Sequence, residues 1–245
     1  MYEAVHARPD GHSTAARMAL TASEYGFAGV VIRNHGDSPA SYDPGRLRDT
    51  YGIDVVTAVE VRADDPSRAS GYVGSHRDEQ TVVLVHGGDQ AINRFAVEQP
   101  AVDVLAHPMA GGGDVNHVLA RAAVRNGVRI ELSLRRALRQ SGGRRVQALQ
   151  DLRKLGEILD EYDTPYVVSA DPRSHLGLRT PRELQAVGEA VGLDAERVVE
   201  GLREWGRLAE RNRERLSDSF VEPGVQRVDS GKDETSGGNH GRDGR

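Results

Sequence analysis

Histidine and acidic side chains recur at the downstream ends of short apolar runs in this sequence. The run 30–32 leads to Arg33 and His35, and the run 82–85 leads to His86. Further members of this pattern are His6, Glu60, His107, Glu131 and Asp171. Histidine and carboxylate groups together are typical ligands of zinc or manganese. The first chemistry that this pattern indicates is therefore hydrolysis by a metal-activated water.

The apolar runs alternate with helical segments, which is the signature of β/α units around a parallel sheet. We expect strands at 2–7, 28–34, 54–61, 81–86, 102–106, 128–134 and 166–170. We expect helices at 13–25, 43–51, 89–99, 114–126 and 144–162, the first opened by Ser13 and the fourth by Asp114. Two more helices are expected to open at Thr180 and Asp194. In a parallel barrel the C-terminal strand ends meet on one face, which carries the function. The sequence thus predicts a TIM-like, α/β barrel with extra C-terminal helices.

The length of 245 residues suits one barrel domain. Seven strands are clear where a regular barrel has eight, so we expect an irregular or seven-stranded barrel, or a short strand hidden at 71–74. The barrel with its C-terminal helices is assigned to residues 1–218. Residues 222–245 are rich in Gly, Ser, Asp and Arg and nearly free of apolar residues, which predicts a disordered tail.

Composition excludes several classes of protein. Without cysteine there are no disulfides and no thiolate metal sites. Neither a signal peptide nor an apolar run of about 20 residues is present, which predicts a cytoplasmic protein that does not enter a membrane. Aromatic residues make up 4% of the chain, so base stacking is not expected to be a main mode of RNA binding.

Positive charge is concentrated in one segment, residues 125–154, which we call the basic island. It holds nine basic and two acidic residues, a local charge of +7 in a chain of net charge −5. Lysine occurs only at Lys154 and Lys232, so 30 of the 32 basic residues are arginine. A GC-rich genome or a salt-rich, halophilic cytoplasm explains that bias equally well. The island predicts a polyanionic partner, and the alternative is a solvated face paired with acidic residues.

Several ordered blocks of the sequence resemble the archaeal ribonuclease P protein component 3 family. They are VDVLAHP at 102–108, NHVLAR at 116–121, GVRIELSLR at 127–135, VSAD at 168–171 and LRTPREL at 178–184. The resemblance runs from residue 1 to about residue 216. It implies a barrel similar to that of the polymerase-and-histidinol-phosphatase (PHP) superfamily.

Active members of the PHP superfamily bind metals through a His-x-His at the first strand, a Glu after the third, further histidines and a late Asp-x-His. Glu60 and His107 fit this pattern. Arg8 stands in place of the second histidine of the His-x-His motif, and Arg173 stands in place of the histidine of the Asp-x-His motif. A site with cations in place of ligands suits a phosphate better than a divalent ion. We therefore expect a vestigial strand-end site without bound metal, although retention of a metal stays open. Its residues are His6, Arg8, His35, Glu60, His86, His107, Glu131 and Asp171.

The resemblance implies a protein subunit of ribonuclease P, the ribonucleoprotein endonuclease that removes the 5′ leader from precursor tRNA. In that family the RNA carries the catalysis and uses Mg²⁺, so no residue of this chain is expected to be catalytic. The implied partners are the ribonuclease P RNA, other protein subunits, especially component 2, and precursor tRNA indirectly. We expect RNA contacts from Arg135, Arg136, Arg144, Arg145, Arg173 and Arg179.

Two alternatives stay open at this point. The chain would be a PHP-type metal-dependent phosphoesterase if His6, Glu60, His107 and Asp171 held zinc or manganese. It would be a scaffold that binds protein only if the basic island served an acidic protein partner. The metal content of the purified protein distinguishes the phosphoesterase from the ribonuclease P subunit. Capture of RNA without a partner subunit distinguishes the ribonuclease P subunit from the scaffold that binds protein only.

Overall fold

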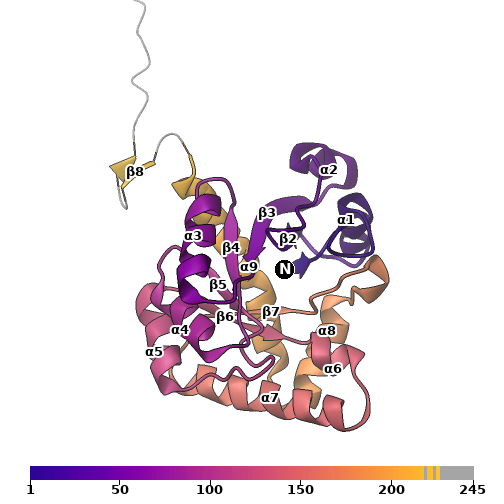
Figure 1. Cartoon of the computed structure of the whole chain (residues 1–245). Helices are drawn as coiled ribbons and strands as arrows, with labels where there is room; N and C mark the ends of the chain where they lie inside the picture. The colour runs from indigo at the N-terminus through magenta and orange to yellow at the C-terminus, as the bar shows by residue number, and fades with distance from the viewer. Residues whose placement is uncertain (218–219, 223–224, 227–245) are drawn as a thin grey trace, which may run out of the picture.

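A computed structural model describes residues 1–217, 220–222 and 225–226 of the chain. In the first of these ranges, seven parallel strands lie in sequence order, each hydrogen-bonded to the next (Figure 1). They are β1 Tyr2–Val5, β2 Gly29–Ile32, β3 Asp54–Val61, β4 Val82–His86, β5 Val104–Ala106, β6 Arg129–Ser133 and β7 Tyr166–Ser169. The prediction of a β/α barrel is confirmed, in its seven-stranded form.

Helices connect the strands and cover the outside of the barrel. They are α1 Ala15–Glu24, α2 Pro44–Tyr51, α3 Pro66–His76, α4 Gln90–Glu98, α5 His117–Asn126, α6 Arg135–Arg139 and α7 Gly142–Glu161. After β7 come the 3-10 helix η1 His175–Gly177, then α8 Pro181–Ala190 and α9 Ala195–Arg215. Side-chain caps explain where several begin: Asp43 and Asp89 accept hydrogen bonds from first-turn amides. Thr180 and Glu183 form the predicted capping box.

The strands place alternate side chains inside the barrel, because successive residues of a strand face opposite sides. This interior is buried and contains Ala4, Val31, Val56, Val82, Leu84, Val104, Ala106 and Val167. Trp205, Leu208 and Ala209 of α9 pack into the same cluster. The other strand face packs against the surrounding helices in a second, larger core. A residue two positions after an interior one therefore also points inward, which places polar side chains above the apolar interior.

Helix α9 closes the N-terminal end of the barrel and packs along β7 and β1 (Figure 1). The indole Nε1 of Trp205 donates to the Val168 carbonyl at 2.9 Å. Charged residues of α9 pair with the starts of three strands: Glu204 with Arg129, Arg211 with Asp103, and Arg213 with Asp54. The helix thus takes part of the place that an eighth strand has in a regular barrel.

Several local predictions were wrong. Residues 71–74 lie inside α3, because Asp65 caps a helix there and Pro66 occupies its first turn. Helix α1 is capped by Thr14 rather than Ser13, whose hydroxyl instead lies 2.8 Å from Nδ1 of His175. Asn116, not Asp114, caps α5. Helix α7 begins at Gly142, two residues before the expected start at 144, and the short helix α6 precedes it.

The predicted disordered tail, 222–245, falls mostly outside the described residues. The part that the structure describes belongs to two antiparallel strands, β8 Phe220–Glu222 and β9 Val225–Gln226. Among the helices of the described ranges, none combines the length and apolar character needed to cross a membrane.

Candidate functional site

Polar side chains from all seven strands meet at the C-terminal end of the barrel. We call them the strand-end cluster: His6, Asp10, Arg33, His35, Glu60, His86, His107, Glu131 and Asp171. Asp10 lies in the loop after β1 and Glu131 in the middle of β6, and the others come from the ends of the strands or from the first residues after them. The structure therefore brings together every residue of the predicted vestigial site except Arg8.

Arg33 occupies the middle of the strand-end cluster and is fully buried. Its Nε and Nη2 lie 2.9 and 2.7 Å from Oε2 of Glu60, and its Nη1 donates to Oε1 of Glu131. Burial alone would raise the pKa of Glu60, but the Arg33 charge and the nearby imidazoles hold it well below its usual value. Glu60 and Glu131 are thus bridged by one guanidinium.

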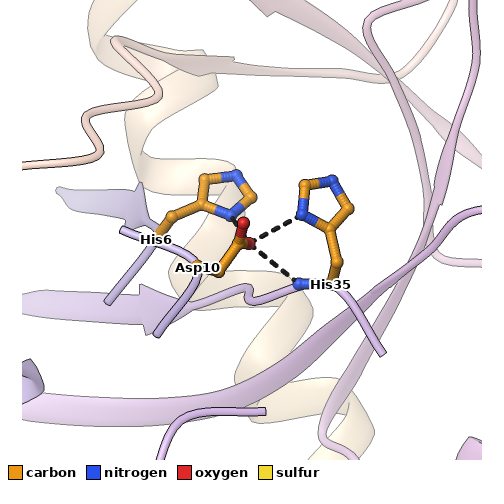
Figure 2. Close-up of side chains that lie close together, drawn as sticks. All are labelled: His6, Asp10 and His35. Atoms are coloured by element: carbon orange, nitrogen blue, oxygen red, sulfur yellow. Dashed lines mark hydrogen bonds and ion pairs between the residues drawn. The ribbon is translucent and has the colours of Figure 1, made fainter. Parts of the chain in front are cut away.

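Asp10 joins two histidines of the cluster, as Figure 2 shows. Its Oδ2 lies 2.6 Å from Nδ1 of His6 and 2.7 Å from Nδ1 of His35, and it also accepts from the His35 backbone amide at 3.1 Å. Burial opposes the charge of Asp10, yet the hydrogen bonds from His35 and His6 hold its pKa far below its usual value. A carboxylate at Nδ1 fixes the orientation of each ring and directs Nε2 into the cluster.

The Nε2 atom of His6 faces a second carboxylate. It lies 3.0 Å from Oδ1 of Asp171 and 3.6 Å from Oε2 of Glu60. Burial would lower the pKa of His6, but Asp10 and Asp171 raise it above its ordinary value. His6 Nε2 and Asp171 Oδ1 are both buried without a hydrogen-bond partner of good geometry in the described structure.

Each carboxylate of the cluster has an arginine as counter-charge. Arg33 serves Glu60 and Glu131, Nη1 of Arg135 lies 3.3 Å from Asp171, and Nη1 of Arg173 lies 3.6 Å from Asp10. A fourth arginine, Arg62, places Nη2 2.7 Å from Nε2 of His35. Arginine thus compensates the buried negative charge throughout the site.

Arg8 does not belong to the cluster, contrary to the sequence-based expectation. Its side chain is exposed, and its Nε donates to the His12 carbonyl at 3.1 Å. The loop that follows β1 turns at this point and directs Asp10 inward instead. Of the two arginines expected in place of histidines, Arg173 alone reaches the cluster, through Asp10.

The sequence-based argument missed Arg33, Asp10 and Arg62 as members of the site. The sequence does contain a signal for Arg33. Val31 faces the interior, and every second residue of a strand points to the same side, so Arg33 should also point inward. The same count places Glu60 inward, two residues after Ala58. Asp10 has no such signal, since its position depends on the course of the loop after β1.

The six arginines predicted to bind RNA lie on segments that follow β6 and β7. Arg135 and Arg136 are on α6, and Arg144 and Arg145 are in the first turn of α7. Arg173 follows β7, and Arg179 follows η1. They differ in their contacts, because some serve internal ion pairs and others face solvent.

Internal contacts engage four of these arginines. Arg135 bonds to Asp171, and Arg136 bonds to Asp151 at 2.8 Å and to the Met109 carbonyl. Arg173 faces Asp10, and Arg179 donates to the carbonyls of Leu176 and Leu178. Arg144 and Arg145 are exposed, and no ion pair or hydrogen bond of their side chains is found in the described part of the chain.

Comparison with known proteins decides the family. The profile of the family described as "RNase P subunit p30" matches residues 1–217. The chain belongs to this family. A relative named "Ribonuclease P protein component 3" from Haloarcula marismortui is 59% identical over 233 residues, which cover 95% of this chain and 99% of the relative. The chain is therefore a protein subunit of ribonuclease P, and the expectation from the resemblance is confirmed over the phosphoesterase alternative.

Solved structures agree with the fold of the p30 family. A chain of "archaeal Ribonuclease P with mature tRNA" superposes with a TM-score of 0.80 at 22% identity, covering 95% of this chain and all of that one. A histidinol phosphate phosphatase from Lactococcus lactis, complexed with zinc, superposes with a TM-score of 0.53 at 10% identity, covering 78% of this chain and 94% of that one. These likenesses support the barrel fold.

Two groups of side chains in the described residues have metal-ligand spacing: His6, Asp10 and His35, and His35, Glu60 and His86. In the first, Asp10 Oδ2 already takes part in hydrogen bonds with both imidazoles. In the second, Glu60 is held by Arg33 and His86, and Nε2 of His35 by Arg62. The second group therefore does not fit a divalent ion without displacement of an arginine, and in the first the Asp10 oxygen is shared between two imidazoles.

Proposed function

We propose that this chain supports ribonuclease P by binding its RNA through the basic island, while the strand-end cluster serves the fold and not catalysis. In this proposal the RNA carries out the cleavage of precursor tRNA with its own Mg²⁺. The chain would work in the cytoplasm, together with the RNA and with other protein subunits. Membership of the p30 family and the likeness to a chain of an archaeal ribonuclease P support these partners.

The observation that carries the proposal is the exposed pair Arg144 and Arg145. Both lie at the start of α7, where the preceding residues Ser141 and Gly142 also face solvent. An arginine without an internal partner is free to form bidentate hydrogen bonds with a phosphate. Helix N-termini favour anions as well, so the same first turn adds a favourable dipole.

The neighbouring arginines have different tasks in this proposal. Arg135 neutralises Asp171 and Arg136 holds Asp151, so their substitution would disturb the protein before it disturbed RNA contacts. Arg179 folds back onto the backbone of its own loop. Charge reversal of Arg135 and Arg179 would therefore change both the internal contacts of the protein and any contact with RNA. Arg144 and Arg145 avoid that difficulty.

The geometry gives little support to a phosphoesterase. The cavity that opens onto His107 and Glu131 has a volume of about 50 Å³. Small-molecule sites usually measure about 300 Å³ or more. The carboxylates beside it, Glu131 and Asp171, are paired with Arg33 and Arg135.

The test is the salt dependence of RNA binding by Arg144→Gln/Arg145→Gln. Each lost phosphate contact lowers the slope of log K against log salt by about 0.7–0.9, so the double variant should lose about 1.4–1.8 in slope. The control is Arg68→Gln/Arg94→Gln, which removes two exposed arginines from α3 and α4. An unchanged slope for the first variant, or an equal loss in the control, would contradict the proposed surface.

A further inference from the structure

A group of arginines lies at the N-terminal end of the barrel, away from the strand-end cluster. We call it the arginine cluster: Arg77, Arg211 and Arg215, whose charges act on one another and on Asp103. Two helices end here, because Arg77 follows the last residue of α3 and Arg215 is the last residue of α9. Helix C-termini favour cations, which explains why several positive charges are tolerated close together.

Asp103 forms ion pairs with only two of the three arginines. Its Oδ2 accepts hydrogen bonds from Nη1 of Arg77 and from the Val83 amide. Its Oδ1 accepts from Nη2 of Arg211 at 3.1 Å. The third arginine, Arg215, is therefore left beside two cations whose carboxylate is already engaged.

Two nitrogen atoms of the arginine cluster lack hydrogen-bond partners. Nε of Arg77 and Nη2 of Arg215 are buried, and in the part of the chain that the structure describes neither has a partner. Arg77 is only 9% exposed as a whole. A buried donor of a charged group is costly to leave unpaired. These two N–H groups therefore indicate an acceptor that does not belong to the described residues.

The charges of the arginine cluster also repel one another. Burial lowers the pKa of Arg215, and the charges of Arg77 and Arg211 lower it further. Asp103 and Asp78 oppose this shift without cancelling it. Burial and neighbouring arginines lower the pKa of Arg211 as well. An anion placed among these side chains would relieve the repulsion.

We infer that the arginine cluster binds a phosphate group. Guanidinium groups form paired hydrogen bonds with phosphate oxygens, which suits several arginines around one tetrahedral ion. Arg211 and Arg215 are four residues apart on α9 and therefore share one face of the helix, while Arg77 approaches from the end of α3. The phosphate is either a free ion or part of an RNA backbone, and only the second source rests on the proposed function.

The test measures the binding of inorganic phosphate to the full chain by titration calorimetry and by thermal unfolding. Chloride keeps the ionic strength constant. The wild-type chain is compared with Arg215→Gln and with Arg203→Gln. Arg203 is the matched control, because it is a half-exposed arginine earlier on the same helix and is paired with Glu200 rather than Asp103.

Wild-type and Arg203→Gln chains should bind about one phosphate each. With phosphate at about ten times its dissociation constant, their unfolding midpoints should rise by about 3–6 °C. Arg215→Gln should lose most of this rise. In chloride alone its midpoint should equal or exceed that of the wild-type chain, because the substitution removes repulsion by Arg77 and Arg211.

Three results would overturn the inference. The first is a midpoint that responds equally to phosphate and to chloride. The second is a phosphate-dependent rise that Arg215→Gln retains or that Arg203→Gln loses to the same extent. The third is an Arg215→Gln chain that unfolds earlier than wild type in chloride alone, because the side chain would then be a structural contact.

RNA binding distinguishes the two sources of the phosphate once the site is found. If the arginine cluster holds a phosphate of the RNA backbone, Arg215→Gln should lower the salt slope of RNA binding by about 0.7–0.9. If it holds a free ion, the slope should keep its wild-type value. The slope of Arg144→Gln/Arg145→Gln is measured on a separate variant, so failure of this inference and failure of the proposed RNA surface remain distinguishable.

Discussion

The two ends of the barrel use the same pair of residue types for different purposes. At the N-terminal end, Arg77 and Asp103 form a buried pair that α9 covers through Arg211. At the C-terminal end, Arg33 bridges Glu60 and Glu131 beneath histidines that reach solvent. The comparison teaches that a buried arginine–carboxylate pair by itself indicates a role in stabilising the fold. Around the second pair, the imidazoles of His6, His35, His86 and His107 also lie close together.

Loss of the buried arginines gives the largest expected effect and tests whether the two pairs are equivalent in the fold. Removing one partner of a buried ion pair costs about 3–5 kcal/mol in the free energy of unfolding. Arg33→Met should lie at the upper end, because it leaves Glu60 and Glu131 both uncompensated. Arg77→Met should cost less, since Asp103 keeps Arg211 at 3.1 Å. Urea unfolding at pH 7 measures both, and the opposite order would break the comparison.

Closure of the N-terminal end by α9 is tested by Trp205→Ala. The side chain is fully buried and its indole donates to Val168, so the substitution should cost about 3–5 kcal/mol. The matched change at the open end is His86→Ala, whose side chain is 29% exposed. Its cost should stay near 1 kcal/mol, the centre of the range for ordinary substitutions. Equal costs would mean that the two ends do not differ in packing.

The seam between β1 and β7 makes stability depend on pH through Glu3. Burial raises the pKa of this carboxyl to about 8, despite hydrogen bonds from Ser169, Ala170 and Ala4. The folded chain therefore holds a proton that the unfolded chain releases near pH 4.5, so stability falls as pH rises between these values. The slope approaches about 1.4 kcal/mol per pH unit.

Glu3→Gln cannot release this proton and isolates its contribution. Subtracting the unfolding free energy of the variant from that of the wild-type chain should give a difference that declines from about pH 4.5 to about pH 8 and is flat above. A difference that does not change with pH would show that Glu3 is ionised in the folded protein.

The smallest expected effect on stability belongs to Arg144→Gln/Arg145→Gln. Both side chains are exposed, and surface substitutions of this kind change the unfolding free energy by about 0.5 kcal/mol or less. A larger loss, measured by the same urea unfolding, would show that the basic island stabilises the fold in the same way as the buried pairs.

The sequence predicts the barrel well because its signals are local. Apolar runs define the strands, and caps such as Asp43, Asp89 and Thr180 define the helix starts. The error at 71–74 has a local cause too: Tyr72 and Val73 between glycines suggested a strand, while the Asp65–Pro66 helix start settled the outcome.

The site is predicted less completely than the fold. Strand ends identify Glu60 and His107, but the role of Arg33 depends on which carboxylates face it across the barrel. Sequence spacing contains no information on that contact. The sequence-based argument looked for cations at Arg8 and Arg173, but Arg8 is exposed and the fully buried guanidinium is that of Arg33.

The most direct test is the rate of precursor tRNA cleavage by reconstituted ribonuclease P that contains one of two variants. The first, His86→Ala/His107→Ala, removes imidazoles from the strand-end cluster, and the second is Arg144→Gln/Arg145→Gln. If the cluster is structural and the island contacts RNA, the first variant keeps the wild-type rate, while the second slows cleavage by about tenfold at elevated salt. A wild-type rate for the arginine variant together with loss of cleavage by the histidine variant would contradict the account.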